Sequence, residues 1–464
     1  MRPVRILVLI TALLAFVVLL SACGEAVPTA QPGRTLVIIT ATPRSTAPPT
    51  PTATPVVPEM SPEQLAGIEV ELWYLAEPYR EDPLAVLTAS FTAENTYGLT
   101  VNPVRFDHPN DLEQAMQTAI ETGDLPDVVL ANPYQYNAWL DSGVSYVSLD
   151  DYVASSNYGL SAEQIADITP VFWDRDVYDG VRLAFPGLFY GEVLLYNRTW
   201  AQELGFTDPP LSSQQFTRQA CASAEARDDG TGGWMINTRP SSAAAWLLSF
   251  AGTLESEDGY QTGLPDIEAA FTFLADLSAE GCAWRSASLY AYQSFAERRG
   301  LFYTVSTREI GAIDEAFGLA DFLDTWDLIG LPNDRGEPAI SVYGRSYVII
   351  ESDQPHQVAA WLLVRSLTDL DSQVVLAETS GYYPLSESAV ETIKANGELS
   401  RAWVNGLSLL DNAYYEPRWP SWGLVRGVVQ DAVAEVVKPG FSVGTLSVVL
   451  DQFQELVEAL HSGQ

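Results

Sequence analysis

Ile68-Glu69-Val70-Glu71-Leu72-Trp73-Tyr74 is a stretch of alternating apolar and acidic residues, a pattern that predicts a β-strand with two different faces. Asp82-Pro83 then predicts the start of a helix. A second strand is predicted from Leu99 to Val104, a second helix over residues 111–120, and a buried strand from Asp127 to Leu130. Strands that alternate with helices in this way indicate an α/β fold with a mainly parallel sheet.

The same alternation resumes later in the chain. Strands are predicted at Val193 to Tyr196 and at Tyr347 to Ile350, and Ser212 with Gln215 forms a capping-box pair that predicts the start of a helix. The sequence contains no repeat of 20 to 50 residues and no second linker. Two α/β lobes built from interleaved segments therefore fit the pattern better than separate domains in a row.

The composition restricts the partners of the protein. The 464 residues include 60 Asp and Glu but only 24 Lys and Arg, which gives a formal net charge of -36. Such a field repels nucleic acids and anionic lipid surfaces. A polyanionic partner is therefore excluded. The hydrophobic residues make up 47% of the chain, which is sufficient for a globular protein of two or more domains.

The N-terminus indicates the compartment. Arg2 and Arg5 precede an apolar run from Ile6 to Leu20, which is shorter than a membrane-spanning helix needs and so predicts a signal peptide over residues 1–22. The order Leu20-Ser21-Ala22-Cys23 resembles the cleavage box of bacterial lipoproteins, which implies a diacylglycerol on the sulfur of Cys23.

We therefore expect an extracytoplasmic protein anchored to a bacterial membrane by its lipid, at the cell surface or in the periplasm. A plain secreted protein is the alternative. Residues 23–60 are rich in Pro and Thr and predict an extended tether between the lipid and the folded part.

Lipidation of Cys23 would leave Cys221 and Cys282 as a pair in an oxidising compartment. We expect these two residues to form a structural disulfide. Two buried free thiols are the alternative.

Four signatures in one order carry a family resemblance. They are Thr122 to Val129, Ala184 to Pro210, Tyr343-Gly344-Arg345-Ser346 and Gly381-Tyr382-Tyr383-Pro384. Their order over nearly all of residues 68–460 resembles the bacterial extracellular solute-binding proteins of the sugar-binding class, the maltose-binding-like receptors of ABC importers.

The resemblance implies a two-lobed fold of the periplasmic-binding-protein type (type II). Each lobe is expected to hold a mainly parallel sheet flanked by helices, with a hinge that the chain crosses several times. By analogy, lobe 1 spans residues 66–186 and 350–400, and lobe 2 spans residues 187–345 and 403–464.

The resemblance also implies a function. A monomeric receptor would capture a small solute, a sugar or oligosaccharide, between its lobes and present it to the permease subunits of an ABC importer. We expect no catalysis, no cofactor and no metal, because the sequence lacks phosphate-loop, metalloprotease and nucleophile-elbow motifs and a metal-spaced set of Cys and His.

Aromatic rings cover the apolar faces of sugars, while amides, carboxylates and guanidinium groups bind their hydroxyls. The candidate ligand-binding residues follow strand ends or the family's contact positions; the alternative for each aromatic residue is ordinary core packing. They are Trp73, Tyr74, Glu77, Asn132, Tyr134, Tyr190, Arg308, Arg345, Tyr383, Trp419 and Trp422.

Three alternative functions remain open at this stage. Arg345 departs from the small residues usual at its position, so it either pairs with an acid of the protein or binds a sugar acid or sugar phosphate. The acidic composition allows a cationic solute such as a polyamine. A secreted glycosidase is the enzyme alternative, and it would need two carboxylates across a cleft.

Overall fold

The first predicted strand divides its side chains between two cores. In β1 (Glu69–Leu75), Val70, Leu72 and Tyr74 pack in one core cluster, and Trp73 packs in another on the opposite face. The structure is a computed structural model that describes residues 57–76, 82–288, 290–397 and 399–463. Cys23, Glu77, the predicted signal peptide and most of the predicted tether lie outside the described residues.

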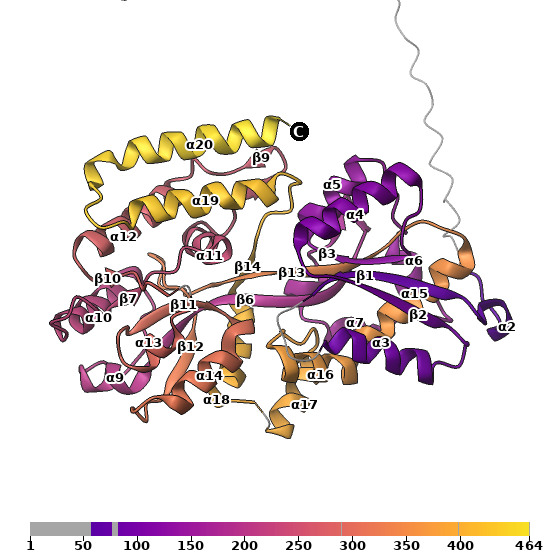
Figure 1. The fold of residues 1–464 in the computed structure, drawn as a ribbon, viewed down its shortest axis with the longest axis horizontal. Helices are drawn as coiled ribbons and strands as arrows, with labels where there is room; N and C mark the ends of the chain where they lie inside the picture. Colours follow the sequence, from indigo (N-terminus) through magenta and orange to yellow (C-terminus); the bar gives the residue numbers. More distant parts are fainter. Residues whose placement is uncertain (1–56, 77–81, 289, 398, 464) are drawn as a thin grey trace, which may run out of the picture. The chain divides into compact units, whose positions relative to one another are not determined.

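One sheet of ten strands runs through the described part of the chain, in the order β10-β7-β11-β6-β13-β3-β1-β2, with β12 also paired to β6 and β14 to β13 (Figure 1). The strands are β1, β2 (Thr100–Phe106), β3 (Val128–Ala131), β6 (Phe185–Asn197), β7 (Trp234–Met235), β10 (Ala283–Trp284), β11 (Phe302–Ser306), β12 (Trp326–Ile329), β13 (Ile340–Ile349) and β14 (Ala413–Tyr415).

The two ends of the sheet are parallel and its centre is antiparallel. Strands β1, β2 and β3 are mutually parallel at one end, and β7, β10 and β11 are parallel at the other. We call the first group with its helices lobe 1 and the second group lobe 2. The predicted α/β fold with two lobes is confirmed.

The strands β6 and β13 join the lobes, and we call them the crossing strands. They pair antiparallel from Ser341 opposite Glu192 to Tyr347 opposite Phe185. In lobe 1 β13 pairs with β3, and in lobe 2 β6 pairs with β11 and β12. Both are longer than the sequence pattern predicted, because β6 starts at Phe185 and β13 at Ile340.

Glycine permits the close contact between the crossing strands. A Cβ atom on Gly344, where φ is +157°, would lie 2.1 Å from the carbonyl oxygen of Leu188. A Cβ atom on Gly187 would lie 2.7 Å from the carbonyl oxygen of Arg345. Because these distances exclude any side chain, the two backbones can approach this closely only at glycine.

Helices cover both faces of the sheet. In lobe 1 they are α2 (Pro62–Leu65), α3 (Pro83–Glu94), α4 (Pro109–Thr122), α5 (Pro133–Asp141), α6 (Leu149–Val153), α7 (Ala162–Asp167), α8 (Pro170–Trp173) and α15 (Gln354–Leu367), followed by α16 (Leu370–Ser380) and α17 (Glu387–Asn396). Asp82 caps α3, as predicted, by accepting from the amides of Leu84 and Ala85.

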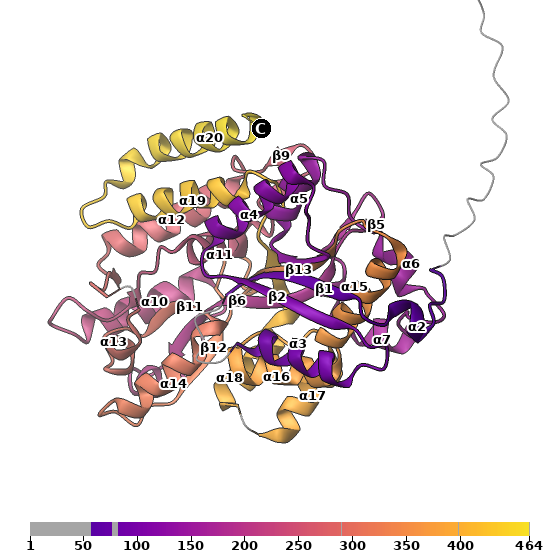
Figure 2. The ribbon, with the colours of Figure 1, turned by 45° about the vertical axis from the view of Figure 1, so that its right-hand side comes forward.

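In lobe 2 the helices are α9 (Arg198–Glu203), α10 (Ser213–Glu225), α11 (Pro240–Ala251), α12 (Pro265–Ala279), α13 (Tyr292–Ala296), α14 (Ile310–Leu319), α18 (Arg401–Gly406), α19 (Trp422–Val436) and α20 (Leu446–Ser462). The predicted capping box of Ser212 and Gln215 begins α10. Both views place α4, α5, α11 and α19 on one side of the crossing strands and α14, α16 and α18 on the other (Figures 1 and 2).

Short elements complete the described chain. They are the two-stranded pairs β4 (Val177–Tyr178) with β5 (Val181–Arg182) and β8 (Glu255–Ser256) with β9 (Gly259–Tyr260), and the 3-10 turns η1 (Thr307–Glu309), η2 (Leu407–Asn412) and η3 (Val443–Thr445).

The largest core clusters separate by lobe. Val128, Ile349 and Trp361 belong to a cluster of lobe 1, and Trp246 and Phe271 belong to a cluster of lobe 2. The residue boundaries that we predict for the lobes remain a prediction. No helix in the described part of the chain is long and apolar enough to cross a membrane.

Cys221 and Cys282 form the predicted disulfide. The bond joins α10 to the segment just before β10 in lobe 2.

We expect Gly344→Ala to lower the free energy of unfolding by about 3 kcal/mol or more, because the added methyl group collides with the backbone of β6. Gly427→Ala in α19 is the matched control, since a Cβ atom there meets nothing within 4 Å. The control should stabilise the helix by up to about 1 kcal/mol. Chemical denaturation of the purified variants measures both values, and equal stabilities would contradict the role given to Gly344.

Candidate functional site

A cavity of about 300 Å³ lies at the crossing strands, and we call it the cleft. Leu75 ends β1, and Asn132 follows β3, so the carboxyl ends of the parallel strands of lobe 1 open into it. From lobe 2, Arg308 follows β11, and Arg239 lies beyond the end of β7. Ligands of open α/β sheets bind at this edge of the strands.

The residues that line the cleft come from both lobes and from both crossing strands. They are Leu75, Pro109, Asn132, Tyr134, Gln135, Leu188, Tyr190, Glu192, Arg239, Pro240, Ser241, Arg308, Tyr343, Gly344, Arg345 and Arg426.

The crossing strands supply the floor of the cleft through the two-residue period of a β-strand. Leu188, Tyr190 and Glu192 share one face of β6, while Tyr343 and Arg345 share one face of β13. The rings of Tyr190 and Tyr343 are 5.8 Å apart between centroids. The cleft therefore has an aromatic floor with hydroxyl, carboxyl and guanidinium groups at its edges.

Three helices begin at the cleft. Pro109 is the first residue of α4, Asn132 is the N-cap of α5, and Pro240 is the first residue of α11. The main-chain amides and the dipole of a helix make its N-terminus electropositive. The amide side chain of Gln135 accepts from the backbone amide of Asn132 at 3.0 Å and completes the capping box of α5.

Two of the four arginines that line the cleft are held by carboxylates behind them. Arg239 makes a bidentate ion pair with Glu309, in which Nη2 lies 2.7 Å from Oε2. Arg426 donates from Nη2 to the hydroxyl of Ser241 at 2.6 Å, and the same nitrogen lies 3.6 Å from Glu416. These contacts fix the direction of both guanidinium groups.

The other two arginines contact the crossing region. The guanidinium carbon of Arg308 lies 5.9 Å from the ring centroid of Tyr190. Arg345 donates from Nη1 to the carbonyl oxygen of Leu75 at 3.4 Å, so the crossing strand β13 is linked to the end of β1.

Glu192 is the one acidic side chain among the described residues that line the cleft. Its carboxylate accepts from the hydroxyl of Ser242 at 2.7 Å and from the hydroxyl of Tyr343 at 3.3 Å. Burial raises the pKa of Glu192 to about 7, although Arg239 opposes the shift.

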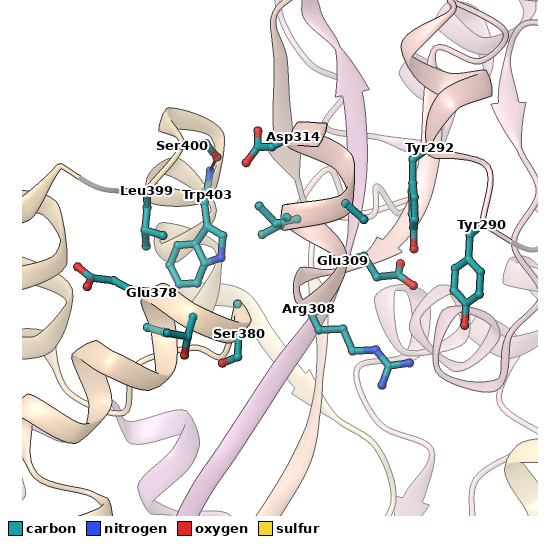
Figure 3. Close-up of a pocket in the computed structure, with 16 residues that line it drawn as sticks. Tyr290, Tyr292, Arg308, Glu309, Asp314, Glu378, Ser380, Leu399, Ser400 and Trp403 are labelled. Carbon is teal, nitrogen blue, oxygen red and sulfur yellow. Dashed lines mark hydrogen bonds between the residues drawn. The ribbon is translucent and has the colours of Figure 1, made fainter. Parts of the chain in front are cut away.

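A second cavity of about 570 Å³ lies on the other side of the crossing strands. In Figure 3, Trp403 lies on one side of this cavity and Tyr290 and Tyr292 on the other, with Arg308 and Glu309 between them. It shares only Arg308 with the cleft and collects no other candidate residue from the sequence. We therefore assign the functional site to the smaller cavity, where the strand ends of both lobes meet.

The structure brings five of the sequence-predicted ligand residues together at the cleft. They are Asn132, Tyr134, Tyr190, Arg308 and Arg345.

Three other candidates lie within cores instead of lining the cleft. The ring of Trp73 packs edge-to-face on Phe106, with 5.3 Å between centroids. Tyr74 is buried and donates to Asp82 at 2.7 Å. Tyr383 is buried beneath β6, where its ring occupies the space beside Gly191.

The two tryptophans near α19 also lie outside the cleft. Trp419 is half-buried and packs edge-to-face on His461, with 4.8 Å between ring centroids. Trp422 is 1% exposed, and its indole donates to Glu416 at 2.8 Å. Glu416 also lies 3.6 Å from Arg426, so Trp422 contacts a carboxylate that pairs with an arginine of the cleft.

Sequence reasoning missed Glu192, Tyr343, Arg239 and Arg426. The first two lie two residues from Tyr190 and Arg345, so the period of a strand would have placed them on the same faces. Arg426 lies four residues after Trp422, one helical turn along α19. Arg239 directly precedes Pro240, which is a helix start signal after a strand.

The sequence matches the family model described as bacterial extracellular solute-binding protein over residues 87–401. No curated protein matches the sequence significantly.

Solved structures share the fold at low sequence identity. The sugar-binding protein MalE from Xanthomonas citri has a TM-score of 0.73 at 18% identity, covering 85% of this chain and 98% of its own. The cyclic alpha-maltosyl-1,6-maltose binding protein from Arthrobacter globiformis has a TM-score of 0.71 at 14% identity, covering 86% of this chain and 100% of its own. UgpB from Mycobacterium tuberculosis, in complex with glycerophosphocholine, has a TM-score of 0.65 at 18% identity, covering 84% of this chain and 98% of its own.

The raised pKa of Glu192 makes stability depend on pH. Between the ordinary carboxyl value and about 7 the folded protein keeps a proton that the unfolded chain releases, so the free energy of unfolding should fall as pH rises. We expect this contribution to reach roughly 3 kcal/mol between about pH 5 and pH 8. Thermal unfolding across this range should show a shallower decline for Glu192→Gln, whereas parallel profiles would contradict the assignment.

Proposed function

Because the chain belongs to the bacterial extracellular solute-binding protein family, we propose that it is the solute receptor of an ABC importer and holds its solute in the cleft. One observation carries the proposal. The strand ends of both lobes and one face of each crossing strand converge on a single cavity with aromatic and hydrogen-bonding walls. A solute there contacts both lobes at once.

The proposed solute is small and polyhydroxylated. Tyr134, Tyr190 and Tyr343 offer ring surface for the C–H faces of a sugar, and Asn132, Glu192 and the arginines offer partners for its hydroxyls. The volume of about 300 Å³ lies at the low end of the ~300–1,000 Å³ typical of ligand sites. This size favours a monosaccharide or disaccharide over a long oligosaccharide.

Closure of the lobes is the proposed signal to the permease. Asn137 of α5 already donates to the carbonyl oxygen of Arg418 at 2.9 Å, and Tyr134 packs against the core cluster of lobe 2. A solute that adds contacts to both lobes stabilises the closed state by its differential affinity for the closed and open states. The permease then recognises the closed form.

The charges in the cleft favour a sugar receptor over a glycosidase and over a polyamine receptor. A glycosidase needs two carboxylates across its cleft, and Glu192 alone lines this one among the described residues. A polyamine site needs an excess of acids, whereas four arginines line the cleft. We therefore propose a receptor without catalytic activity.

The receptor is proposed to work outside the cytoplasm as a lipoprotein. The lipoprotein-like order Leu20-Ser21-Ala22-Cys23 supports the anchor, and the disulfide between Cys221 and Cys282 fits an oxidising compartment. We retain residues 1–22 as the signal peptide, 23–60 as the tether, and the two lobes with their predicted boundaries.

A pair of tyrosine variants tests the position of the site. Tyr134→Ala should weaken solute binding at least about tenfold, which is roughly 1.4 kcal/mol, because it removes a ring from the cleft. Tyr290→Ala is the comparison, since Tyr290 lines the second cavity, is 53% exposed and reaches the cleft only through Arg239, whose guanidinium carbon lies 5.4 Å from its ring centroid. Titration calorimetry with neutral sugars, sugar acids, sugar phosphates and spermidine provides the affinities. Loss of binding in Tyr290→Ala but not in Tyr134→Ala would move the site to the second cavity.

A cysteine variant tests the anchor. In a bacterial host, the wild-type protein should incorporate radiolabelled palmitate and partition into a detergent phase, whereas Cys23→Ser should do neither, because it lacks the acceptor sulfur. Cys221→Ser is the control and should keep the label. Equal labelling of Cys23→Ser would exclude this lipidation site.

A further inference from the structure

Arg418 lies in the short segment that joins β14 to α19, between Pro417 and Pro420. Proline fixes its own backbone φ angle, so this segment has few alternative conformations. The segment is also attached to lobe 2, because Glu416 accepts from the indole of Trp422 at 2.8 Å and Trp422 belongs to the lobe 2 core. Arg418 is therefore carried by a stiff part of lobe 2.

Glu255 of β8 orients the side chain of Arg418 within lobe 2. The Nε atom of Arg418 donates to Oε1 of Glu255 at 3.1 Å, and the backbone amide of Arg418 donates to Oε2 at 2.7 Å. The side chain of Arg418 is 35% exposed and that of Glu255 is 20% exposed, so water reaches the ion pair only in part. One carboxylate that binds both the main chain and the side chain of the same residue fixes the direction of the guanidinium group.

From this position Arg418 contacts lobe 1. Its guanidinium carbon lies 4.8 Å from the ring centroid of Tyr178 in β4, and Nη1 donates to the carbonyl oxygen of Arg175 at 3.0 Å. The carbonyl oxygen of Arg418 accepts from the side-chain amide of Asn137 in α5 at 2.9 Å. Tyr178 packs against the core cluster that contains Trp73, and Asn137 lies on a lobe 1 helix, so both partners belong to lobe 1.

We propose that Arg418 is an interlobe clasp, whose contacts with Tyr178 and Asn137 hold lobe 1 against lobe 2 and set how readily the cleft opens. The clasp lies beside the cleft, because Asn137 is about one helical turn from the cleft residue Tyr134 on α5. Separation of the lobes breaks a cation–π contact and a hydrogen bond together. Every group of the clasp belongs to the protein, so the inference goes beyond the proposed function and its test needs no solute.

The distance between spin labels on the two lobes tests the clasp. Leu140→Cys in α5 and Leu456→Cys in α20 place the labels at exposed positions, 39% and 53% in the native side chains. A Cys23→Ser background restricts the labels to these sites, because Cys221 and Cys282 are bonded to each other. Double electron–electron resonance is then measured on the full-length protein without any solute.

We expect Arg418→Gln to add a population with a longer distance between the labels. The equilibrium constant for separation of the lobes should rise about tenfold or more, because the variant loses the cation–π contact and the ion pair that orients it. Arg198→Gln is the matched control, since it removes the same charge from an ion pair with Asp327 inside lobe 2, and its distances should equal those of the wild type. An unchanged distance distribution in Arg418→Gln would overturn the proposal.

Two variants on the lobe 1 side separate a clasp from a purely local role of Arg418 in lobe 2. Tyr178→Leu removes the ring under Arg418 and should lengthen the distance in the same way. Tyr178→Phe keeps the ring and loses only the hydroxyl contacts with Tyr136 and Asn137, so it should stay close to the wild type. Wild-type distances in Tyr178→Leu would overturn the clasp, and this pair of variants decides the matter even if Arg418→Gln does not fold.

Discussion

The backbone contact between the two crossing strands is the constraint on which the cleft depends. At Gly344 and Gly187 the strands approach so closely that a side chain would collide with the opposite backbone. This contact fixes the register of β6 against β13, and the register decides which side chains face which side. Tyr190 and Arg345 then face the cleft, while Phe189, Val193 and Val342 pack in the core cluster beneath the strands. A shift of one residue in this register would turn the side chains of the core cluster towards the cleft and the cleft side chains towards the core.

Electrostatics at the cleft are built in two layers. Arginines form the wall, and carboxylates behind them hold the guanidinium groups in place, as Glu309 does for Arg239 and Glu416 for Arg426. Trp422 belongs to the second layer, because its buried indole binds Glu416.

Local patterns predicted the elements whose signals are complete within a few residues. The alternation of apolar and acidic residues predicted β1. Asp82 predicted the start of α3, and Ser212 with Gln215 predicted the start of α10. The sequence pattern underestimated the length of the crossing strands, because Pro186, Gly187, Gly191 and Gly344 are poor strand formers. Only the tertiary contact between the strands explains their presence there. The resemblance placed Tyr190 and Arg345 at the cleft. The resemblance did not reveal that Trp422 is a core residue and not a cleft residue. Its burial in the core of lobe 2 depends on α20 and α12, which are distant in sequence.

The location of the bound solute is the decisive test of the assigned site. A crystal structure of the protein grown with its tightest-binding solute answers the question without any variant. We predict that the solute lies between Tyr134, Tyr190 and Arg345 and contacts both lobes. Electron density for the solute in the cavity of Figure 3, against Tyr290 and Trp403, would contradict it.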